Sequence, residues 1–212
     1  MFDILILSNG PGEITTWVRP VVKALRNKLG DDRDYARISV VLSPCSNASG
    51  KEADIALSYP EVDRVQSALG FFPFLITGKT ADNWDWRNKG VVLFLGGDQF
   101  FPVVIGKRLN YRTVIYAEWE ARWHSLINRF GVMKSEVTKN VKSKYADKFT
   151  VVGDLMAEAS LEKTGGQRDR ETRRQGDGDK EYLIGILPGS KAAKLAQGVP
   201  LSLAIAQYIN SK

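Results

Sequence analysis

Short apolar runs alternate with stretches of helical periodicity along most of the chain. The runs are rich in β-branched residues and several end in glycine, which is typical of strands buried on both faces. Continuous apolar strands separated by helices predict an α/β fold with a doubly wound, parallel, Rossmann-like sheet. The expected strands span residues 2–7, 38–42, 62–65, 91–95, 113–117, 149–152 and 183–187, and the expected helices span residues 16–29, 51–58, 101–109, 134–145 and 200–209.

The polar loops that follow the expected strands are the natural place for a ligand. In a doubly wound sheet, ligands bind beyond the carboxyl ends of the strands, because loops from neighbouring strands meet there. We therefore expect one crevice, lined by the loops at residues 8–13, 43–50, 96–99 and 118–123.

The composition changes abruptly after residue 161. Of the 21 residues from 162 to 182, twelve are charged and four are glycine, which is typical of a flexible linker or a mobile surface loop. A further strand and helix follow in residues 183–212, which is too little chain for an independent core. We expect residues 1–161 to form one Rossmann-like domain, and residues 183–212 either to pack on it or to begin a truncated second α/β domain.

The overall composition is that of an ordinary globular protein and narrows the classes of chemistry. The 212 residues are 43% apolar and 25% charged, with one cysteine, Cys45, and one histidine, His124. These counts exclude an internal disulfide, a multi-cysteine metal site and a His-rich metal site, so we expect neither metal nor cofactor and give His124 a structural role. No secretion-type basic leader and no run of ~18 apolar residues is present, so the expected location is the cytoplasm.

Basic residues concentrate in one stretch of the chain. Residues 104–150 contain ten Lys or Arg and four Asp or Glu, which accounts for the whole net charge of +6. Such a surface either serves solvation alone or favours an anionic partner, such as a phosphosugar or a phospholipid headgroup. No nucleic-acid recognition motif accompanies it, so nucleic acid ranks last. The uncharged aromatic run at residues 69–76 is either a buried core segment or a segment that dips into a membrane interface.

The loop after the first strand, Ser8-Asn9-Gly10-Pro11-Gly12-Glu13, is the first candidate site. Gly10 and Gly12 let the backbone approach a ligand closely, and a helix N-terminus favours an anion. The pattern is not the dinucleotide-binding GxGxxG. The loop is therefore either a ligand site made of Asn9, Gly10, Gly12 and Glu13, or a tight strand-to-helix turn in which Glu13 lies favourably at the helix start.

Two further loops at the same edge carry candidate chemistry. Asp98 follows Gly96-Gly97 after a buried strand, and it is either a general base toward a hydroxyl group or the N-cap of the next helix. Around residues 117–124, acids lie beside tryptophans. Glu118 and Trp123 there either bind a sugar, which presents apolar C–H faces beside hydroxyl groups, or are a surface charge and a core residue.

The loop after the last expected strand completes the series. Gly189, Ser190 and Lys191 combine a glycine, a hydroxyl and a cation, which suits the phosphates of a nucleotide or a phosphosugar. The Walker pattern is absent, which argues against NTP hydrolysis. The alternative is a plain loop between a strand and a helix.

Taken in order, four motifs resemble the lipid-A-disaccharide synthase family, and more closely the lipid-A-disaccharide synthase-related proteins of bacteria. The resemblance spans nearly the whole chain but only about the first half of such an enzyme. The motifs are residues 8–13, Gly97-Asp98, Val152-Gly153-Asp154-Leu155-Met156 and Ile186-Leu187-Pro188-Gly189-Ser190-Lys191.

The resemblance implies a GT-B glycosyltransferase, in which two Rossmann-like domains face each other across a cleft. The N-terminal domain would receive a lipid-like or phosphosugar acceptor, and the second domain would hold the UDP-sugar donor, with an acylated glucosamine as the transferred sugar. Asp98 would be the base of an inverting, metal-independent transfer by a peripheral protein on the cytoplasmic face of the plasma membrane. The acceptor-binding residues would be Asn9, Gly10, Gly12, Glu13, Glu118 and Trp123, and the donor-phosphate residues Gly189, Ser190 and Lys191.

Two other functions stay open. A UDP-sugar 2-epimerase shares the two-domain architecture, but it inverts a sugar stereocentre without an acceptor. A non-catalytic module would bind a glycolipid or an anionic surface, and it would bind phospholipid without releasing UDP.

Overall fold

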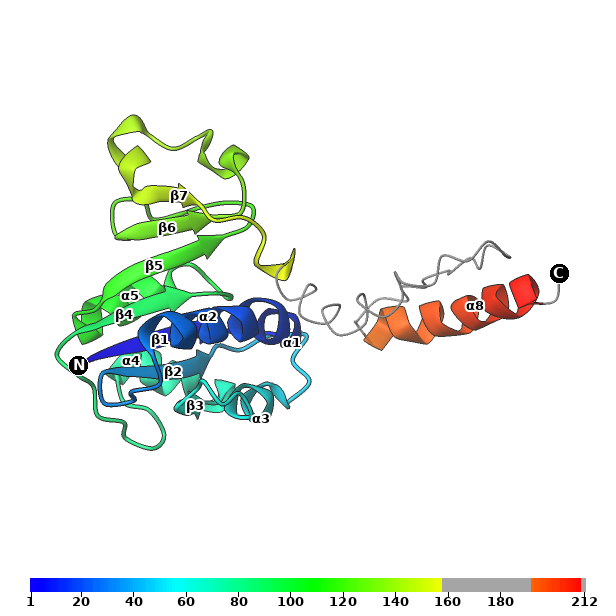
Figure 1. The fold of residues 1–212 in the computed structure, drawn as a ribbon, viewed down its shortest axis with the longest axis horizontal. Helices are drawn as coiled ribbons and strands as arrows, with labels where there is room; N and C mark the ends of the chain where they lie inside the picture. Colours follow the sequence, from blue (N-terminus) through cyan, green and yellow to red (C-terminus); the bar gives the residue numbers. More distant parts are fainter. Residues whose placement is uncertain (158–191, 211–212) are drawn as a thin grey trace, which may run out of the picture. The chain divides into compact units, whose positions relative to one another are not determined.

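The computed structural model describes residues 1–157 and 192–210. The chain divides into two compact units, residues 1–167 and residues 168–212. The described part of the second unit is one helix, α8 (Ala192–Asn210), drawn in orange and red in Figure 1. This helix contains the predicted helix at residues 200–209 and begins earlier, with Pro200 inside it. The predicted linker at residues 162–182 and the predicted strand at residues 183–187 lie outside the described residues.

One seven-stranded sheet forms the centre of the first unit, in the order β3-β2-β1-β4-β5-β6-β7 (Figure 1). Every neighbouring pair of strands is parallel, which confirms the predicted doubly wound α/β fold. The strands are β1 (Phe2–Ser8), β2 (Ala36–Leu42), β3 (Arg64–Gln66), β4 (Gly90–Phe94), β5 (Arg112–Ala117), β6 (Arg129–Val132) and β7 (Phe149–Val151).

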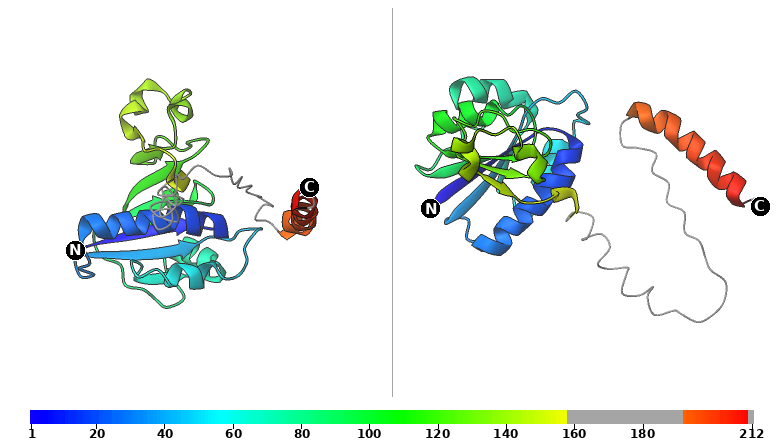
Figure 2. Two further views of the ribbon diagram at one scale, coloured as in Figure 1. Left: turned by 45° about the vertical axis from the view of Figure 1, so that its right-hand side comes forward. Right: turned by 90° about the horizontal axis from the view of Figure 1, so that it is seen from above.

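Side chains of β1 alternate between two separate cores. Ile4 and Ile6 belong to the core that α2 and α3 cover, whereas Leu5 and Leu7 belong to the core that α4 and α5 cover. Because β1 is buried on both faces, its sequence is a continuous apolar run. The right-hand view of Figure 2 shows the sheet between the two helical layers. The helices are α1 (Pro11–Glu13), the π-helical turn η1 (Ile14–Val18) and α2 (Arg19–Leu29), which form one run, then α3 (Glu52–Leu57), the 3-10 turn η2 (Ala68–Gly70), α4 (Phe71–Thr77) and α5 (Phe101–Leu109).

The hydrophobic pattern does not predict two of these elements, β6 and α4. β6 contains Gly131, where a Cβ would lie 3.2 Å from Val152 Cγ2. This glycine allows close packing, whereas in a sequence pattern a glycine predicts the end of a strand. α4 is the aromatic run of the sequence, and its helical period is hidden because both of its faces are apolar.

The predicted helix at residues 134–145 is wrong. The segment forms two 3-10 turns instead, η3 (Ser135–Thr138) and η4 (Ser143–Lys148). Thr138 Oγ1 donates to the carbonyl oxygen of Ser135 at 2.7 Å, and such side-chain bonds compete with helical backbone bonds. The helix predicted from residue 16 begins at Pro11, because proline suits the first helical position, where its missing N–H costs nothing.

A buried polar network ties the amino ends of the strands together. Asp3 on β1 is fully buried, and it accepts hydrogen bonds from Arg37 Nε at 2.9 Å, from the Arg87 backbone N–H at 2.9 Å and from Tyr111 Oη at 2.7 Å. Burial acts to raise the pKa of Asp3, but the hydrogen bonds outweigh burial and hold the pKa below its ordinary value. The network therefore keeps a carboxylate ionised inside the protein, at the edge of the sheet opposite the predicted crevice.

Candidate functional site

The strand order reverses between β1 and β4, which places a topological switch point at the carboxyl ends of these two strands. Ligands of doubly wound sheets bind at such a point. Backbone pairing continues past the strand ends, since the Ser43 N–H donates to the Ser8 carbonyl at 2.8 Å and the Leu95 N–H to the Leu7 carbonyl at 2.7 Å. The loops after β1, β2 and β4 are thereby held side by side, as the sequence predicts.

Two glycines form a cradle between these loops. A Cβ at Gly96 would lie 2.7 Å from Asn9 Oδ1 and 3.1 Å from Glu13 Cγ, so both side chains close onto this glycine. A Cβ at Gly10 would lie 2.6 Å from Glu13 Oε2 and 3.3 Å from Cys45 Sγ. The structure thus brings together three of the predicted residues, Asn9, Gly10 and Glu13, and adds Gly96 and Cys45 to them.

Glu13 and Gly12 occupy different positions relative to this cradle. Glu13 lies in the first turn of α1, where the helix dipole favours a negative charge. The Glu13 residue is half-buried. Gly12 is exposed, and a Cβ there would meet nothing within 4 Å, so this glycine lies outside the cradle.

Three buried side-chain polar atoms among the described residues have no hydrogen-bond partner, and all of them lie near this cradle in the sequence. They are Ser8 Oγ, Asn9 Oδ1 and Trp17 Nε1. A buried polar atom without a partner costs about 1–3 kcal/mol, so such atoms are rare in native proteins. Their concentration in ten residues around the switch point makes this loop and helix start the candidate site for a polar ligand.

Asp98 lies just beyond the cradle and is exposed. Its Oδ1 accepts the Phe100 N–H at 2.8 Å, and its carbonyl oxygen accepts the Phe101 N–H at 3.0 Å. Asp98 therefore closes the turn before α5, where Phe100 is the N-cap residue. The bond to Oδ1 orients the carboxylate and leaves Oδ2 available to solvent.

Gln99 is a residue that sequence reasoning missed. It is buried, its Nε2 donates to the Glu120 carbonyl at 2.8 Å, and its Oε1 accepts the Arg122 N–H at 2.8 Å. This side chain fastens the loop after β5 to the loop after β4. No local signal could have found it, because both partners come from another strand connection.

Glu118 and Trp123 lie on the loop that Gln99 fastens. Glu118 is half-buried directly after β5. Trp123 has a left-handed backbone (φ 60°), and its ring packs against Phe100 with centroids 5.0 Å apart. Trp123 thus forms an exposed aromatic pair beside the Asp98 turn.

Trp17 and Tyr116 form an aromatic pair near the carboxyl end of β5, on the face of the sheet that α2 covers. Their ring centroids are 5.4 Å apart in an edge-to-face arrangement. Tyr116 Oη donates to the Gly153 carbonyl at 3.2 Å and accepts the Leu155 N–H at 3.4 Å. Burial raises the pKa of Tyr116, so its hydroxyl keeps its proton. Sequence reasoning missed both aromatic residues, which come from segments far apart in the chain.

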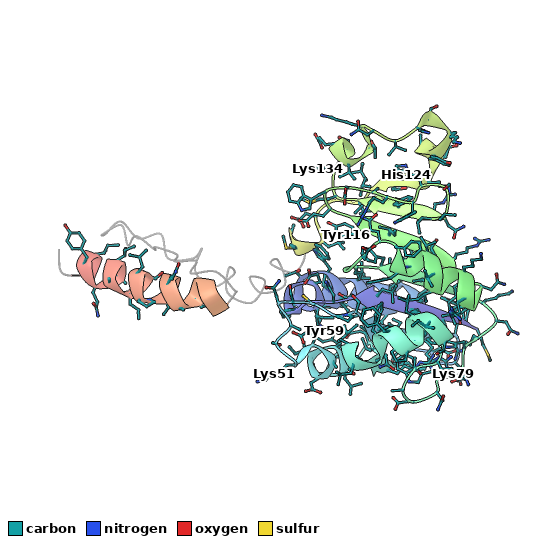
Figure 3. The ribbon with its side chains drawn as sticks, turned by 180° about the vertical axis from the view of Figure 1, so that it is seen from behind. Lys51, Tyr59, Lys79, Tyr116, His124 and Lys134 are labelled. Carbon is teal, nitrogen blue, oxygen red and sulfur yellow. The ribbon has the colours of Figure 1, made fainter. Side chains whose placement is uncertain are left out.

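His124 lies away from Tyr116, toward β7 (Figure 3). Its ring packs edge-on against Phe130 and Phe149, and its Nε2 is 2.7 Å from the Ala121 carbonyl. These contacts agree with the structural role expected for His124.

The aromatic run at residues 69–76 is in part a core segment, and the structure does not test the membrane-interface role considered for it. Phe71 and Phe74 are fully buried in the core. Leu69, Phe72 and Ile76 are exposed, with Leu69 94% exposed. The run therefore packs one apolar face into the core and exposes a second apolar face.

The remaining sequence candidates do not enter the described site. Gly189, Ser190 and Lys191 lie outside the described residues. In the part of the chain that the structure describes, no group of three His, Cys, Asp or Glu side chains is placed to hold a metal ion. Among the described helices, none has the length and apolarity needed to cross a bilayer. No protein-family model matches the sequence, and no curated protein matches it.

Proposed function

We propose that residues 1–161 form the acceptor-binding domain of an inverting, metal-independent GT-B glycosyltransferase. The observation that carries this proposal is the convergence of Asn9 and Glu13 on Gly96 at the switch point, beside the exposed carboxylate of Asp98. The acceptor is a lipid-like or phosphorylated sugar, and the donor is a UDP-sugar of the acylated glucosamine type. Gly189, Ser190 and Lys191 would contact the donor phosphates.

In the proposed reaction, Asp98 accepts the proton of an acceptor hydroxyl group. The freed oxygen attacks C1 of the donor sugar from the face opposite UDP. The new C1–O bond forms as the bond between C1 and the UDP oxygen breaks, and UDP leaves with that electron pair. The Phe100 N–H on Oδ1 holds the carboxylate in one orientation, which leaves Oδ2 to accept the proton.

Replacing Asp98 with Asn tests this proposal in the full-length protein. Release of UDP from UDP-N-acetylglucosamine would be measured with a phosphosugar or glycolipid acceptor in mixed phospholipid micelles. General-base catalysis contributes roughly 10²- to 10⁴-fold, so the Asp98→Asn variant should lose that factor with an unchanged melting temperature. Asp82→Asn, which alters an exposed carboxylate on another loop, is the control and should retain the wild-type rate.

Two outcomes would count against the proposal. A near-normal rate in the Asp98→Asn variant would remove Asp98 as the base. UDP release or sugar inversion that needs no acceptor would favour a 2-epimerase instead.

A second candidate function is a non-catalytic module on an anionic membrane surface, and the outward face of α4 favours it. Leu69, Phe72 and Ile76 are exposed together, in a chain whose net positive charge arises within residues 104–150. Apolar side chains with nearby cations bind interfaces of anionic lipid. Binding to phosphatidylglycerol vesicles without any UDP release would select this function, and the same binding with UDP release would make the enzyme peripheral.

A further inference from the structure

Trp17 lies in an irregular turn of the first helix. The η1 turn (Ile14–Val18) is π-helical, and the Arg19 N–H donates to the Ile14 carbonyl, five residues back. Single π-turns inside α-helices recur at functional sites, because the extra residue shifts the side chains of that turn. Pro20 follows Arg19 and has no backbone N–H to donate, so the regular helical hydrogen-bond pattern is interrupted there.

The indole N–H of Trp17 is buried and has no partner among the described residues. Indole nitrogen can only donate, so its partner must be an acceptor. Trp86 provides a contrast within the same domain, since its Nε1 donates to the Gly78 carbonyl at 3.3 Å. A phenylalanine at position 17 would fill most of the same space without an unpaired donor, so packing alone does not explain the indole.

Trp17 is close to the cradle through the helix that carries it. Glu13, which closes on Gly96, lies four residues earlier and therefore one helical turn away. The Trp17 ring packs on Tyr116 at the end of β5, whose own hydroxyl is engaged by Gly153 and Leu155. The Tyr116 side chain is thus held in place by its hydrogen bonds. The Trp17 N–H beside it is a donor without a partner among the described residues.

We propose that Trp17 is a specificity-determining residue of the crevice, and that its N–H donates to an oxygen atom of the bound sugar. This inference rests on the proposed function, which makes the ligand of the crevice a sugar. The ligand oxygen is either a hydroxyl or the carbonyl of an N-acyl group. The N–H is covered in this conformation, so binding includes a small shift of the Trp17 side chain.

Nuclear magnetic resonance of the ¹⁵N-labelled full-length chain reads this contact directly. The Trp17 indole signal is assigned by its loss in Trp17→Phe, and Trp86→Phe is the matched control. Titration with N-acetylglucosamine 1-phosphate and with glucose 1-phosphate should move the Trp17 signal, and Trp17→Phe should weaken binding about three- to tenfold, the range expected for one hydrogen bond. An effect with both sugars assigns a hydroxyl acceptor, and an effect with the N-acetyl sugar alone assigns the amide carbonyl.

The melting temperatures separate recognition from structure. Trp17→Phe should melt at or above the wild-type temperature, because it removes an unpaired donor, whereas Trp86→Phe should melt lower. A Trp17→Phe variant that melts as low as Trp86→Phe would show that the indole serves the fold, through packing or a structural partner, and would overturn the inference. Sugar binding that moves the Asn9 signals with no change at Trp17 and no loss in Trp17→Phe would overturn it while leaving the proposed function standing. Absence of any sugar-induced shift would overturn both.

Discussion

Among the described residues, buried side-chain polar atoms without a hydrogen-bond partner occur at the carboxyl end of the parallel sheet and not at its amino end. At the amino end, the carboxylate of Asp3 accepts hydrogen bonds from three different segments of the chain. At the carboxyl end, Ser8 Oγ, Asn9 Oδ1 and Trp17 Nε1 are buried without partners. Buried polar groups are normally paired. The paired groups at the amino end therefore stabilise the fold, and the unpaired groups at the carboxyl end reduce its stability. The comparison agrees with the proposal that the ligand binds at the carboxyl end.

Removing the carboxylate of Asp3 should disrupt the hydrogen-bond network at the amino end of the sheet and have the largest effect on the free energy of unfolding. Asp3→Ala leaves Arg37 and Arg87 without their shared acceptor, and loss of one partner of a buried charge pair costs about 3–5 kcal/mol. Urea denaturation measures the free energy of unfolding. Asp82→Asn, at an exposed carboxylate, should change it by less than about 0.5 kcal/mol. Equal effects of the two variants would mean that the amino end contributes no special stability.

Adding a methyl group at Gly96, at the carboxyl end of the sheet, should destabilise the fold less than Asp3→Ala does. Its larger effect should be on sugar binding. In Gly96→Ala the new Cβ would meet Asn9 Oδ1 at 2.7 Å and Glu13 Cγ at 3.1 Å, so both side chains must move. Overpacking of this kind costs about 1–3 kcal/mol, and the displaced side chains should abolish binding of N-acetylglucosamine 1-phosphate. Gly12→Ala, where a Cβ meets nothing within 4 Å, is the control for stability and should not destabilise the fold. Unchanged sugar affinity in Gly96→Ala would place the ligand elsewhere.

Lowering the pH should gradually weaken the Asp3 network at the amino end of the sheet, with the smallest effect on stability of the three changes. The folded-state pKa of Asp3 lies below its unfolded value, which is about 3.9. The contribution of Asp3 to stability is therefore fully present above that unfolded value and is lost as the pH falls through the folded pKa. Thermal melts from pH 7 to pH 2 should show a steeper acid loss in the wild type than in Asp3→Asn, which cannot titrate. Parallel curves would show that Asp3 is not a source of the acid sensitivity.

Much of the fold could be predicted because the central strands are buried on both faces. β1, β2 and β4 read as continuous apolar runs, and α5 has the predicted bounds. The misses have physical causes as well. β6 is short and contains a glycine that packs closely, α4 is apolar on both faces, and the hydroxyl groups of residues 135–143 favour turns over a helix.

The candidate site could be predicted only where its residues share a loop. Asn9, Gly10 and Glu13 were expected together because they follow one strand. Gln99, Trp17 and Tyr116 were not expected, because their partners come from other segments. Gln99 bonds to a loop more than twenty residues away, and Tyr116 to a carbonyl 37 residues away.

The sequence by itself determined the alternation of strands and helices, the parallel sheet, and therefore the edge where the loops gather. These features follow from the hydrophobic periodicity of each segment, which depends only on the residues of that segment. Only the tertiary structure decided which polar groups are paired. Asp3 meets Tyr111 across 108 residues of chain, while Trp17 meets no acceptor at all among the described residues. Pairing depends on distances between segments far apart in sequence, and no local pattern encodes those distances.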